Sequence, residues 1–517
     1  MAQTQKPRVA VIGAGMGGLA AAVALSRHCE VRLFERAAAP GGKVSQTAIG
    51  DARIDSGPTV FTMRWVFDAL FEKAGARFDD HVSLSMLNRL ARHGWRDGSR
   101  LDLYRDEERS AAAIADFAGR AEAERYRSFL RRTKEMYETL RDPFLLSDRP
   151  DMVGLLKGAN PLALGNVQPF SSMWKALSKQ FRDPRLRQLF ARYATYCGSS
   201  PFDAPATLAL IAHVEQSGVW TLDGGMAALA RALETVARDN GVETTYDAHV
   251  EEIIAHQGRA RGVVLQSGAR VDADAVIVNG DAAAVANGGF GRAVADAVPP
   301  AARHAQRSQS AMTWTMLGAA SGFDLSVHNV FFSDDYREEF DCVFRRKSMA
   351  PTPTTYIFAP DRQEDGRQGG TSPGGDAERL FCLVNAPAIG DAHVFTEQEI
   401  DQCEERMNAH LRQCGLTIAA PPDHKRAATP NDFAERFPGT GGAIYGMASH
   451  GWRASFQRPG VRTTLRGLYL AGGSVHPGPG VPMAALSGQA AARAVLKDCG
   501  LTAASPPAAT PGGTRTR

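Results

Sequence analysis

The sequence lacks two features that would place it in familiar classes. Outside a glycine- and alanine-rich stretch near residue 20 it has no run of 18 or more apolar residues, and a helix needs about 20 to cross a bilayer. It also has little excess of charge of either sign, because it contains 59 Lys and Arg and 56 Asp and Glu, for a net charge of +3. We therefore expect no spanning helix, and bulk charge indicates no nucleic-acid partner.

Cysteine is scarce and is not arranged in pairs. The seven cysteines are Cys29, Cys197, Cys342, Cys382, Cys403, Cys414 and Cys499, and they form no CxxC motif. This pattern predicts neither a disulfide framework nor a metal site, and a reducing cytoplasmic setting is its simplest interpretation. At 517 residues the chain is long enough for two or three domains.

Glycine, in contrast, is concentrated near the start of the chain. Residues 8–12 form a short apolar run typical of a buried parallel strand, and Gly13-Ala14-Gly15-Met16-Gly17-Gly18 follows it. Gly13 permits a tight turn, Gly15 lets backbone approach a pyrophosphate, and Gly18 allows close packing of a helix over about residues 17–27. The first N–H groups of that helix suit a phosphate.

A carboxylate follows at the spacing that a dinucleotide site needs. Residues 31–34 predict a second strand, which ends at Glu35, about 20 residues after the glycines, where it can accept hydrogen bonds from ribose. An alternative is a secretory signal peptide, since Lys6 and Arg8 precede the uncharged residues 9–25. The strand–turn–helix–strand context favours a nucleotide-binding fold.

Two further segments separate FAD from NAD. Pro40-Gly41-Gly42-Lys43 lies just beyond Glu35, and Asp55-Ser56-Gly57-Pro58-Thr59 follows. Such segments bring bare backbone and a cation alongside the extended pyrophosphate and ribityl chain of a flavin, although Pro-Gly-Gly alone is simply a turn. We predict that this part of the FAD site includes Arg36, Gly42, Lys43, Pro58 and Thr59.

The second glycine-rich segment lies near the other end of the chain. Residues 467–471 predict a strand, residues 472–482 a glycine- and proline-rich turn, and residues 481–497 a helix with many small side chains. The start of this helix would lie beside the flavin ring and stabilise its reduced form. The predicted contacts are Gly472, Gly473, Val481, Pro482 and Met483. His476 lies in a tight loop between Val475 and Pro477, which favours a structural over a catalytic role.

These residues carry a resemblance to a known family. The run from Gly467 through Ser487 resembles the signature of bacterial-type phytoene and carotenoid desaturases, within the amine-oxidase-like FAD superfamily. The segments 193–201 and 220–226 are similar to that family too. Val475 and Pro479 depart from the phytoene pattern and favour another subgroup. Over almost the whole chain the sequence most resembles the enzymes that introduce the C-3,4 double bond into acyclic 1-hydroxy or 1-methoxy carotenoids.

The resemblance implies an FAD-dependent oxidoreductase acting on CH–CH groups. Hydride would leave an allylic carbon of a carotenoid for flavin N5, and the polyene would delocalise the remaining charge, so we name no catalytic acid or base. The implied partners are a carotenoid from the bilayer, the membrane surface, and oxygen or a quinone as electron acceptor. The resemblance also places Val250 at the adenine end of FAD.

The expected fold is a mixture of α/β and α+β structure with a discontinuous, Rossmann-like FAD-binding domain. We expect that domain to use residues 1–75, 220–285 and 455–500, with residues 250–254 as a strand and 262–265 and 275–278 as a hairpin. Residues 76–219 would form a helical, membrane-associating substrate part, and 286–454 a substrate domain with a mixed sheet. Residues 360–376 predict an exposed polar loop, and 501–517 a disordered tail.

Two stretches have the composition of a membrane-surface segment. Residues 152–164 are apolar with one lysine, and Met173, Trp174, Leu177 and Phe181 then recur at helical spacing among basic residues. This pattern suits a helix on anionic lipid, on the cytoplasmic face. The alternative is an ordinary helix that buries this stripe in the core.

Three other functions stay open at this point. A phytoene desaturase or another carotenoid oxidase would share the whole pattern. An amine oxidase-like enzyme would share the FAD motifs but needs a compact aromatic pocket. A lipid-binding escort resembling GDP-dissociation inhibitors would keep the architecture without flavin, and the intact Glu35, Lys43 and C-terminal glycine segment argue against it.

Overall fold

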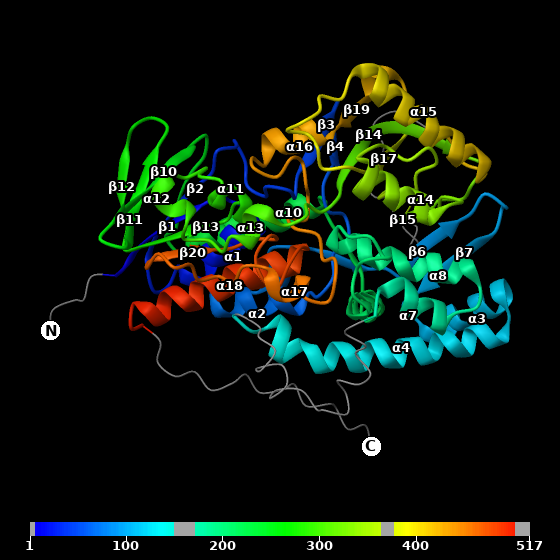
Figure 1. The fold of residues 1–517 in the computed structure, drawn as a ribbon, viewed down its shortest axis with the longest axis horizontal. Coiled ribbons are helices and arrows are strands. Elements are labelled where there is room, and N and C mark those ends of the chain that lie inside the picture. Colours follow the sequence, from blue (N-terminus) through cyan, green and yellow to red (C-terminus); the bar gives the residue numbers. More distant parts are fainter. Residues whose placement is uncertain (1–5, 149–170, 363–376, 502–517) are drawn as a thin grey trace.

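The computed structural model describes residues 6–148, 171–362 and 377–501 and shows a mixed α/β fold. Figure 1 shows two groups of strands, one around β1 and β13 and one around β14, β6 and β7, with helices packed over both. The described α-helices are α1 (Met16–Leu25), α2 (Trp65–Lys73), α3 (Glu107–Ala118), α4 (Arg120–Leu140), α7 (Met173–Gln180), α8 (Pro184–Ala191), α9 (Ile211–Gln216), α10 (Met226–Asp239), α11 (Ala282–Ala286), α12 (Arg292–Ala295), α13 (Ala301–His304), α14 (Tyr336–Asp341), α15 (Glu397–Gln413), α16 (Pro430–Arg436), α17 (Ala454–Gln457) and α18 (Val481–Asp498).

A five-stranded parallel sheet lies at the centre of the first group. Its strands run in the order β20 (Leu468–Leu470), β13 (Ala275–Val278), β1 (Arg8–Ile12), β2 (Glu30–Phe34) and β9 (Glu243–Thr245). The central strands β1 and β13 are almost entirely buried, which is typical of a parallel sheet with both faces covered. The sheet therefore joins three stretches of chain that are far apart in the sequence.

The helices α1 and α18 pack together beside this sheet (Figure 1). Small residues permit the contact: a Cβ built on Gly488 of α18 would lie only 2.0 Å from the carbonyl oxygen of Gly17 in α1. The predicted helices near both ends of the chain are thus confirmed, and residues 9–25, which also matched a signal peptide, form β1 and α1 in the core.

The predicted hairpin between residues 262–265 and 275–278 is wrong. The strand β11 (Arg259–Leu265) pairs instead with β10 (Val250–His256) and β12 (Arg270–Asp272), in a separate antiparallel sheet. The strand β13 joins the parallel sheet between β1 and β20. Its four residues are all buried, which suits the middle of a covered sheet and not the second strand of an exposed hairpin.

The mixed sheet that we expected for the substrate part is present. It contains β18 (Thr417–Ala419), β14 (Ser310–Ser321), β17 (Glu378–Ala386), β16 (Thr355–Phe358), β15 (His328–Phe331), β6 (Arg89–Gly94) and β7 (Arg100–Tyr104), with β19 (Lys425–Ala428) on β14. Only β15 and β6 pair in parallel within it. Two small ladders, β3 (Gln46–Ile49) with β4 (Ala52–Asp55) and β5 (Leu84–Met86) with β8 (Trp220–Leu222), complete the described strands.

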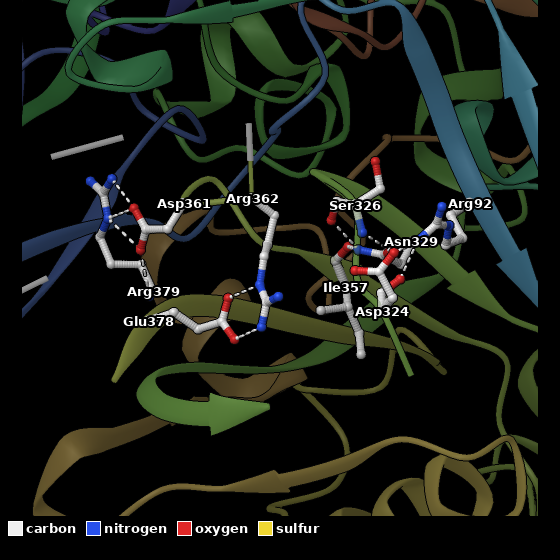
Figure 2. Close-up of polar contacts among 9 residues, drawn as sticks. All are labelled: Arg92, Asp324, Ser326, Asn329, Ile357, Asp361, Arg362, Glu378 and Arg379. Carbon is white, nitrogen blue, oxygen red and sulfur yellow. Dashed lines mark hydrogen bonds and ion pairs between the residues drawn. The ribbon is translucent and has the colours of Figure 1, made fainter. Parts of the chain in front are cut away.

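Ion pairs join the ends of strands in this sheet to the neighbouring loops. Arg379 pairs with Asp361 at 2.5 Å, and Arg362 pairs with Glu378 at 2.7 Å (Figure 2). Asp361 and Arg362 begin the stretch that we predicted to be an exposed polar loop, and both are half-buried. Residues 363–376 lie outside the described residues. On β6, Arg92 binds Asp324 at 2.6 Å and so ties this strand to the turn before β15.

The helical part does not present the predicted apolar stripe to a membrane. Met173, Leu177 and Phe181 are at most 1% exposed and pack with α4 and α8 in a shared core. Trp174 is half-buried, with its ring 4.7 Å from that of Phe202. The stripe is ordinary core: the basic residues between its members face outward, as they do on any surface helix. The second predicted stretch, residues 152–164, lies outside the described residues, as does the tail beyond residue 501.

The described helices also bear on membrane crossing. Within residues 6–148, 171–362 and 377–501, none combines the length and the apolar character that a membrane span requires.

Candidate cofactor site and adjoining cavity

The first glycine-rich turn, residues 13–18, connects β1 to α1 and lies against the end of β2. The N–H of Gly13 donates to the carbonyl oxygen of Phe34 at 2.7 Å, which joins the turn to the end of β2. A Cβ on Gly18 would lie 1.9 Å from the carbonyl oxygen of Gly13, so only glycine fits there. Gly15, at the start of α1, makes no side-chain cap, and the first N–H groups of the helix have no partner within it.

Glu35 lies at the same edge of the sheet. Its carboxylate accepts the N–H of Ala14 at 2.6 Å and that of Ala37 at 2.8 Å. The backbone carbonyl of Glu35 accepts the N–H of Ala248, two residues before Val250, so the start of β10 lies beside Glu35. The predicted neighbour Arg36 is exposed, and its guanidinium donates to the carbonyl oxygens of Glu435 and Arg436.

The Pro-Gly-Gly-Lys segment lies beside the first glycine turn. Gly41 forms a parallel bridge with Gly15, and a Cβ on Gly42 would lie 3.2 Å from the Cα of Gly15. The ammonium of Lys43 donates to the carbonyl oxygen of Ile444 at 2.8 Å. Burial lowers the pKa of Lys43, and the charge of Asp281 partly opposes this effect. The structure thus brings a half-buried lysine and bare backbone to the edge that carries Glu35.

The C-terminal segment closes against the first turn. A Cβ on Gly17 would lie 2.7 Å from the amide nitrogen of Gly472. The hydroxyl of Ser487 in α18 accepts the N–H of Gly472 at 2.7 Å, and the carbonyl oxygen of Gly473 accepts a guanidinium N–H of Arg458. The predicted strand, glycine turn and helix therefore form one unit with α1.

Sequence reasoning missed two residues that organise this unit. The side chain of Asn279, directly after β13, donates to the carbonyl oxygen of Gly13 and lies against Gly15, Gly17 and Gly472. A polar residue at the carboxyl end of a parallel strand is a signal for such a site, but the hairpin interpretation hid it. Arg458 is buried and donates to the carbonyls of Tyr445, Met447 and Gly473, and no sequence pattern marks it.

A cavity of about 800 Å³ adjoins the two segments predicted to contact the flavin, residues 55–59 and 472–483, which we call the cofactor segments. Pro58 and Thr59 line it from one side, and Val481, Pro482 and Met483 line it from the start of α18. Its other walls are mainly apolar and include Leu140, Phe144, Leu208, Ile211, Trp452 and Phe456. Its volume lies in the upper part of the usual range for small-molecule sites, roughly 300–1,000 Å³.

A buried charged cluster forms part of the cavity wall. Arg192 and Tyr196 belong to the 3₁₀ helix η3 (Arg192–Cys197), and Glu215 belongs to α9. Glu215 accepts hydrogen bonds from the hydroxyls of Tyr193 and Tyr196, and a guanidinium nitrogen of Arg192 lies 3.7 Å from it. Burial lowers the pKa of Arg192, but Tyr196 and Glu215 outweigh burial and raise it, so Arg192 stays charged.

A second polar group lies near the cofactor end of the cavity. The hydroxyl of Tyr356 is 2.6 Å from that of Thr59 and 2.7 Å from Nδ1 of His328. Burial and the charge of Arg192 lower the pKa of His328 to about 3, so His328 is neutral. His476 instead lies against backbone: its Nε2 is 2.7 Å from the carbonyl oxygen of Phe144, and burial lowers its pKa to about 4.

The residues at the sheet edge fit a dinucleotide. Unpartnered N–H groups at a helix start, side-chain-free backbone and a buried carboxylate after β2 occur together, and they suit pyrophosphate and ribose respectively. No cluster of His, Cys, Asp or Glu among the described residues is arranged to hold a metal ion. The arrangement is thus a candidate cofactor site that adjoins an apolar cavity.

Comparison with known proteins points to flavin enzymes. The chain is 49% identical to a hydroxyneurosporene desaturase of Rubrivivax gelatinosus, over 99% of this chain and 97% of that protein. It is 44% identical to a hydroxyneurosporene desaturase of Cereibacter sphaeroides, over 95% of this chain and 98% of the relative. A 4,4'-diapolycopene oxygenase of Methylomonas is 31% identical, over 96% and 100%.

Solved structures share the fold at low sequence identity. A putrescine oxidase variant superposes with a TM-score of 0.60 at 15% identity, covering 96% of this chain and 99% of its own. Cyclohexylamine oxidase from Brevibacterium oxydans gives a TM-score of 0.58 at 15% identity, with 96% and 100% covered. The flavin containing amine oxidoreductase family matches residues 16–496, and the chain belongs to that family.

Proposed function

We propose that the protein is an FAD-dependent carotenoid desaturase that introduces the C-3,4 double bond into acyclic 1-hydroxy or 1-methoxy carotenoids. The observation that carries this proposal is similarity over nearly the whole chain to three proteins named hydroxyneurosporene desaturase, at 49%, 44% and 41% identity. The large apolar cavity that meets the cofactor segments agrees with a long hydrocarbon substrate.

In this proposal the parallel sheet is a discontinuous, Rossmann-like FAD-binding domain. The turn from Gly13 to Gly18 would hold the pyrophosphate, Glu35 the ribose, and the segments around Lys43, Thr59 and Gly472 the flavin half. When bound, FAD supplies an acceptor for hydride from the allylic carbon. The start of α18, at Val481, directs its N–H groups and positive dipole end to this region, which favours negative charge there.

The cavity residues have the tasks of binding, orientation and exclusion of water. Leu208, Ile211 and Phe456 provide apolar walls for a polyene, and their burial by substrate is favourable at roughly 25 cal/mol per Å². Loss of hydride would leave a cation whose charge the conjugated chain delocalises. The neighbouring carbon of this cation then loses a proton. A strong base is therefore not required, and we assign none. For the electron acceptor that turnover needs, we propose oxygen or a membrane quinone.

The cavity is unsuited to the cationic substrate of an amine oxidase. Two buried guanidinium groups, those of Arg192 and Arg458, belong to its lining. The carboxylate of Glu215 is already bound to two tyrosine hydroxyls. An ammonium group would therefore lie near like charges, and the described lining of the cavity contains no Asp or Glu to balance it, which is unfavourable.

We also propose that the protein binds a membrane surface on the side where Phe144 and Trp452 line the cavity. Trp452 is 37% exposed, and Leu146, two residues beyond Phe144, is 39% exposed. The exposed Arg141 and Arg453 lie close by in the sequence and suit anionic lipid. A substrate that resides in the bilayer could enter the cavity from such a surface.

Purified protein tests the function directly. It should contain FAD and convert 1-hydroxyneurosporene or 1-hydroxylycopene to a product that absorbs at longer wavelength, because the new double bond extends the polyene. It should act poorly on phytoene and should not oxidise amines. Efficient conversion of phytoene with no activity on hydroxylated carotenoids would contradict the proposed substrate and leave an FAD-dependent desaturase.

A further inference from the structure

The segment around η3 places a charged group in the cavity wall that hydride transfer does not need. The side chain of Arg192 is 9% exposed, lines the cavity, and lies among apolar residues and the rings of Tyr193 and Tyr196. A buried charge in a site for a hydrocarbon chain is costly unless it has a partner. Glu215 is the charge partner of Arg192, so the feature that needs an explanation is the set of guanidinium donors that no acceptor binds.

The guanidinium of Arg192 has more donors than the protein satisfies. Its Nη1 donates to the hydroxyl of Tyr196 at 3.2 Å. Within the described part of the chain, Nε and Nη2 have no hydrogen-bond partner, and Nη2 is 3.7 Å from Glu215. Glu215 balances the charge and accepts hydrogen bonds from two tyrosine hydroxyls, but its separation of 3.7 Å from Nη2 is too long for a hydrogen bond. Because arginine can only donate, it needs a further acceptor.

Tyr336 is a second unsatisfied donor that lines the same cavity. Its hydroxyl is buried and has no hydrogen-bond partner among the described residues. Burial and the charge of Glu339 raise the pKa of Tyr336, and the charge of Arg192 opposes them. The phenol is therefore neutral, keeps its proton for donation, and lies within electrostatic reach of Arg192.

These donors share the cavity with residues beside the cofactor segments, because Arg192, Tyr336, Tyr356 and Thr59 all line it. The charge of Arg192 acts on His328 and Tyr356, and the hydroxyl of Tyr356 is 2.6 Å from that of Thr59, beside the cofactor segments. In a 1-hydroxy carotenoid the oxygen on C1 is only two carbon–carbon bonds from C3, the nearer reacting carbon. A group that binds this oxygen has to lie in the same cavity as the reacting carbons, and Arg192 lines the cavity that Thr59 and Tyr356 also line.

We propose that Arg192, together with Tyr336, binds the oxygen atom at the C1 end of the substrate and so sets the enzyme's preference for oxygenated carotenoids. This inference rests on the proposed function and adds the specificity-determining residues. Hydroxyl and methoxy oxygens both accept hydrogen bonds, so a donor-only guanidinium accommodates both. A hydrocarbon end leaves the buried donors unpaired and is disfavoured.

The test compares 1-hydroxylycopene with 1,2-dihydrolycopene, which has the same carbon skeleton and the same C3–C4 single bond but no oxygen. The measured quantity is the ratio of kcat/KM for the two substrates, with purified FAD-loaded protein. Arg192→Met should lower this ratio by roughly 10- to 100-fold. Tyr336→Phe, which removes a single hydroxyl, should lower it by about 3- to 10-fold.

Tyr126→Phe is the matched control. It also removes a buried tyrosine hydroxyl near α9, one that donates to Gln216 at 3.3 Å and does not line the cavity, so the ratio should not change. Arg192→Lys, which keeps the charge, should retain more of the ratio than Arg192→Met. A ratio in Arg192→Met equal to that of the unmodified protein would overturn the inference.

Two further outcomes separate the inference from the proposed function. If Arg192→Met does not fold, Tyr336→Phe decides, and an unchanged ratio in that variant rejects the assignment. If the unmodified protein converts both substrates equally well, the desaturase function stands and the inference fails. If it converts neither substrate nor the methoxy analogue, the proposed function itself fails.

Discussion

Gly17 and Gly472 touch across the two ends of the chain: a Cβ on Gly17 would lie 2.7 Å from the amide nitrogen of Gly472. The same Cβ would lie 2.5 Å from the side-chain oxygen of Asn279. The start of α1, the residue after β13 and the C-terminal glycine segment thus pack against one another at Gly17. A side chain at this position would clash with the other two segments. This contact makes the cofactor site dependent on both glycine-rich segments at once.

Gly17→Ala should therefore weaken the fold and the cofactor site together. We expect a loss of about 1–3 kcal/mol in the free energy of unfolding, as for other overpacked positions, and release of FAD. Thermal unfolding and the flavin absorbance that co-elutes with the protein measure both effects. Gly98→Asn is the control, because a Cβ on Gly98 meets nothing within 4 Å and asparagine tolerates its positive φ of +79°.

Gly15→Val should abolish FAD binding and leave the remote mixed sheet folded. A Cβ on Gly15 would lie 2.6 Å from the side-chain nitrogen Nδ2 of Asn279, and Gly15 itself belongs to the backbone that a pyrophosphate has to approach. Flavin retention should be lost while the circular dichroism spectrum stays close to that of the unmodified apoprotein. Unchanged affinity for FAD in this variant would show that the nucleotide site is assigned wrongly.

Met173→Ala and Leu177→Ala should each destabilise the protein by about 2–5 kcal/mol, because both side chains are buried in the core that α7 shares with α4 and α8. Urea unfolding measures the change. The exposed neighbour Lys175 on the same helix provides the control, since Lys175→Ala should change stability by less than about 0.5 kcal/mol. Equal effects of all three substitutions on stability would contradict the burial of Met173 and Leu177 in this core.

Leu146→Ser combined with Trp452→Ser should reduce the recovery of the protein with anionic liposomes in flotation. These two exposed apolar residues lie on the side where Phe144 and Trp452 line the cavity. Val394→Ser is the matched control, because Val394 is 77% exposed and lies outside the cavity lining. Flotation that the double substitution leaves intact, in a folded protein, would argue against this membrane surface.

Stability should fall as the pH is lowered from 7 to 5. Burial and the charge of Arg192 lower the pKa of His93 and of His328 to about 3, against about 6.5 in the unfolded chain. The unfolded state therefore binds more protons below pH 6.5. The stability that each neutral histidine contributes is complete above that pH and is lost toward pH 3, at about 1.4 kcal/mol per unit.

Chemical unfolding at several pH values between 7 and 5 measures this slope. His93→Phe should reduce the slope of unfolding free energy against pH by the contribution of one histidine. The substitution retains the ring contact with Phe332, whose centroid lies 6.0 Å from that of His93. An identical slope in that variant would mean that His93 takes up a proton without unfolding.

The cofactor side of the molecule was largely predictable from the sequence, because its chemistry depends on local pattern. Gly13, Gly15 and Glu35 have spacings fixed by one strand–turn–helix unit, and the structure brings them to one edge. The strand β13 was assigned to the wrong sheet, since a short apolar run does not reveal its partners.

The cavity wall was not predictable in the same way. Arg192 and Glu215 meet through the packing of η3 against α9, and Asn279 meets Gly472 because β13 and β20, which precede them, pair in the parallel sheet. Long-range contacts of this kind leave no periodic signal. The stripe at Met173 had a signal, but amphipathic periodicity is the same for a helix on lipid and a helix on a protein core.

The parallel sheet also constrains when the protein can mature. The strand β20, at Leu468–Leu470, pairs with β13 at one edge of the sheet, and α18 then covers α1. A chain emerging from the ribosome folds from its N-terminal end, yet β1 and α1 stay without this cover until β20 and α18 have been made. During translation the apolar surface of α1 that α18 covers is therefore exposed until residues 481–498 have been made, which favours aggregation of the incomplete chain.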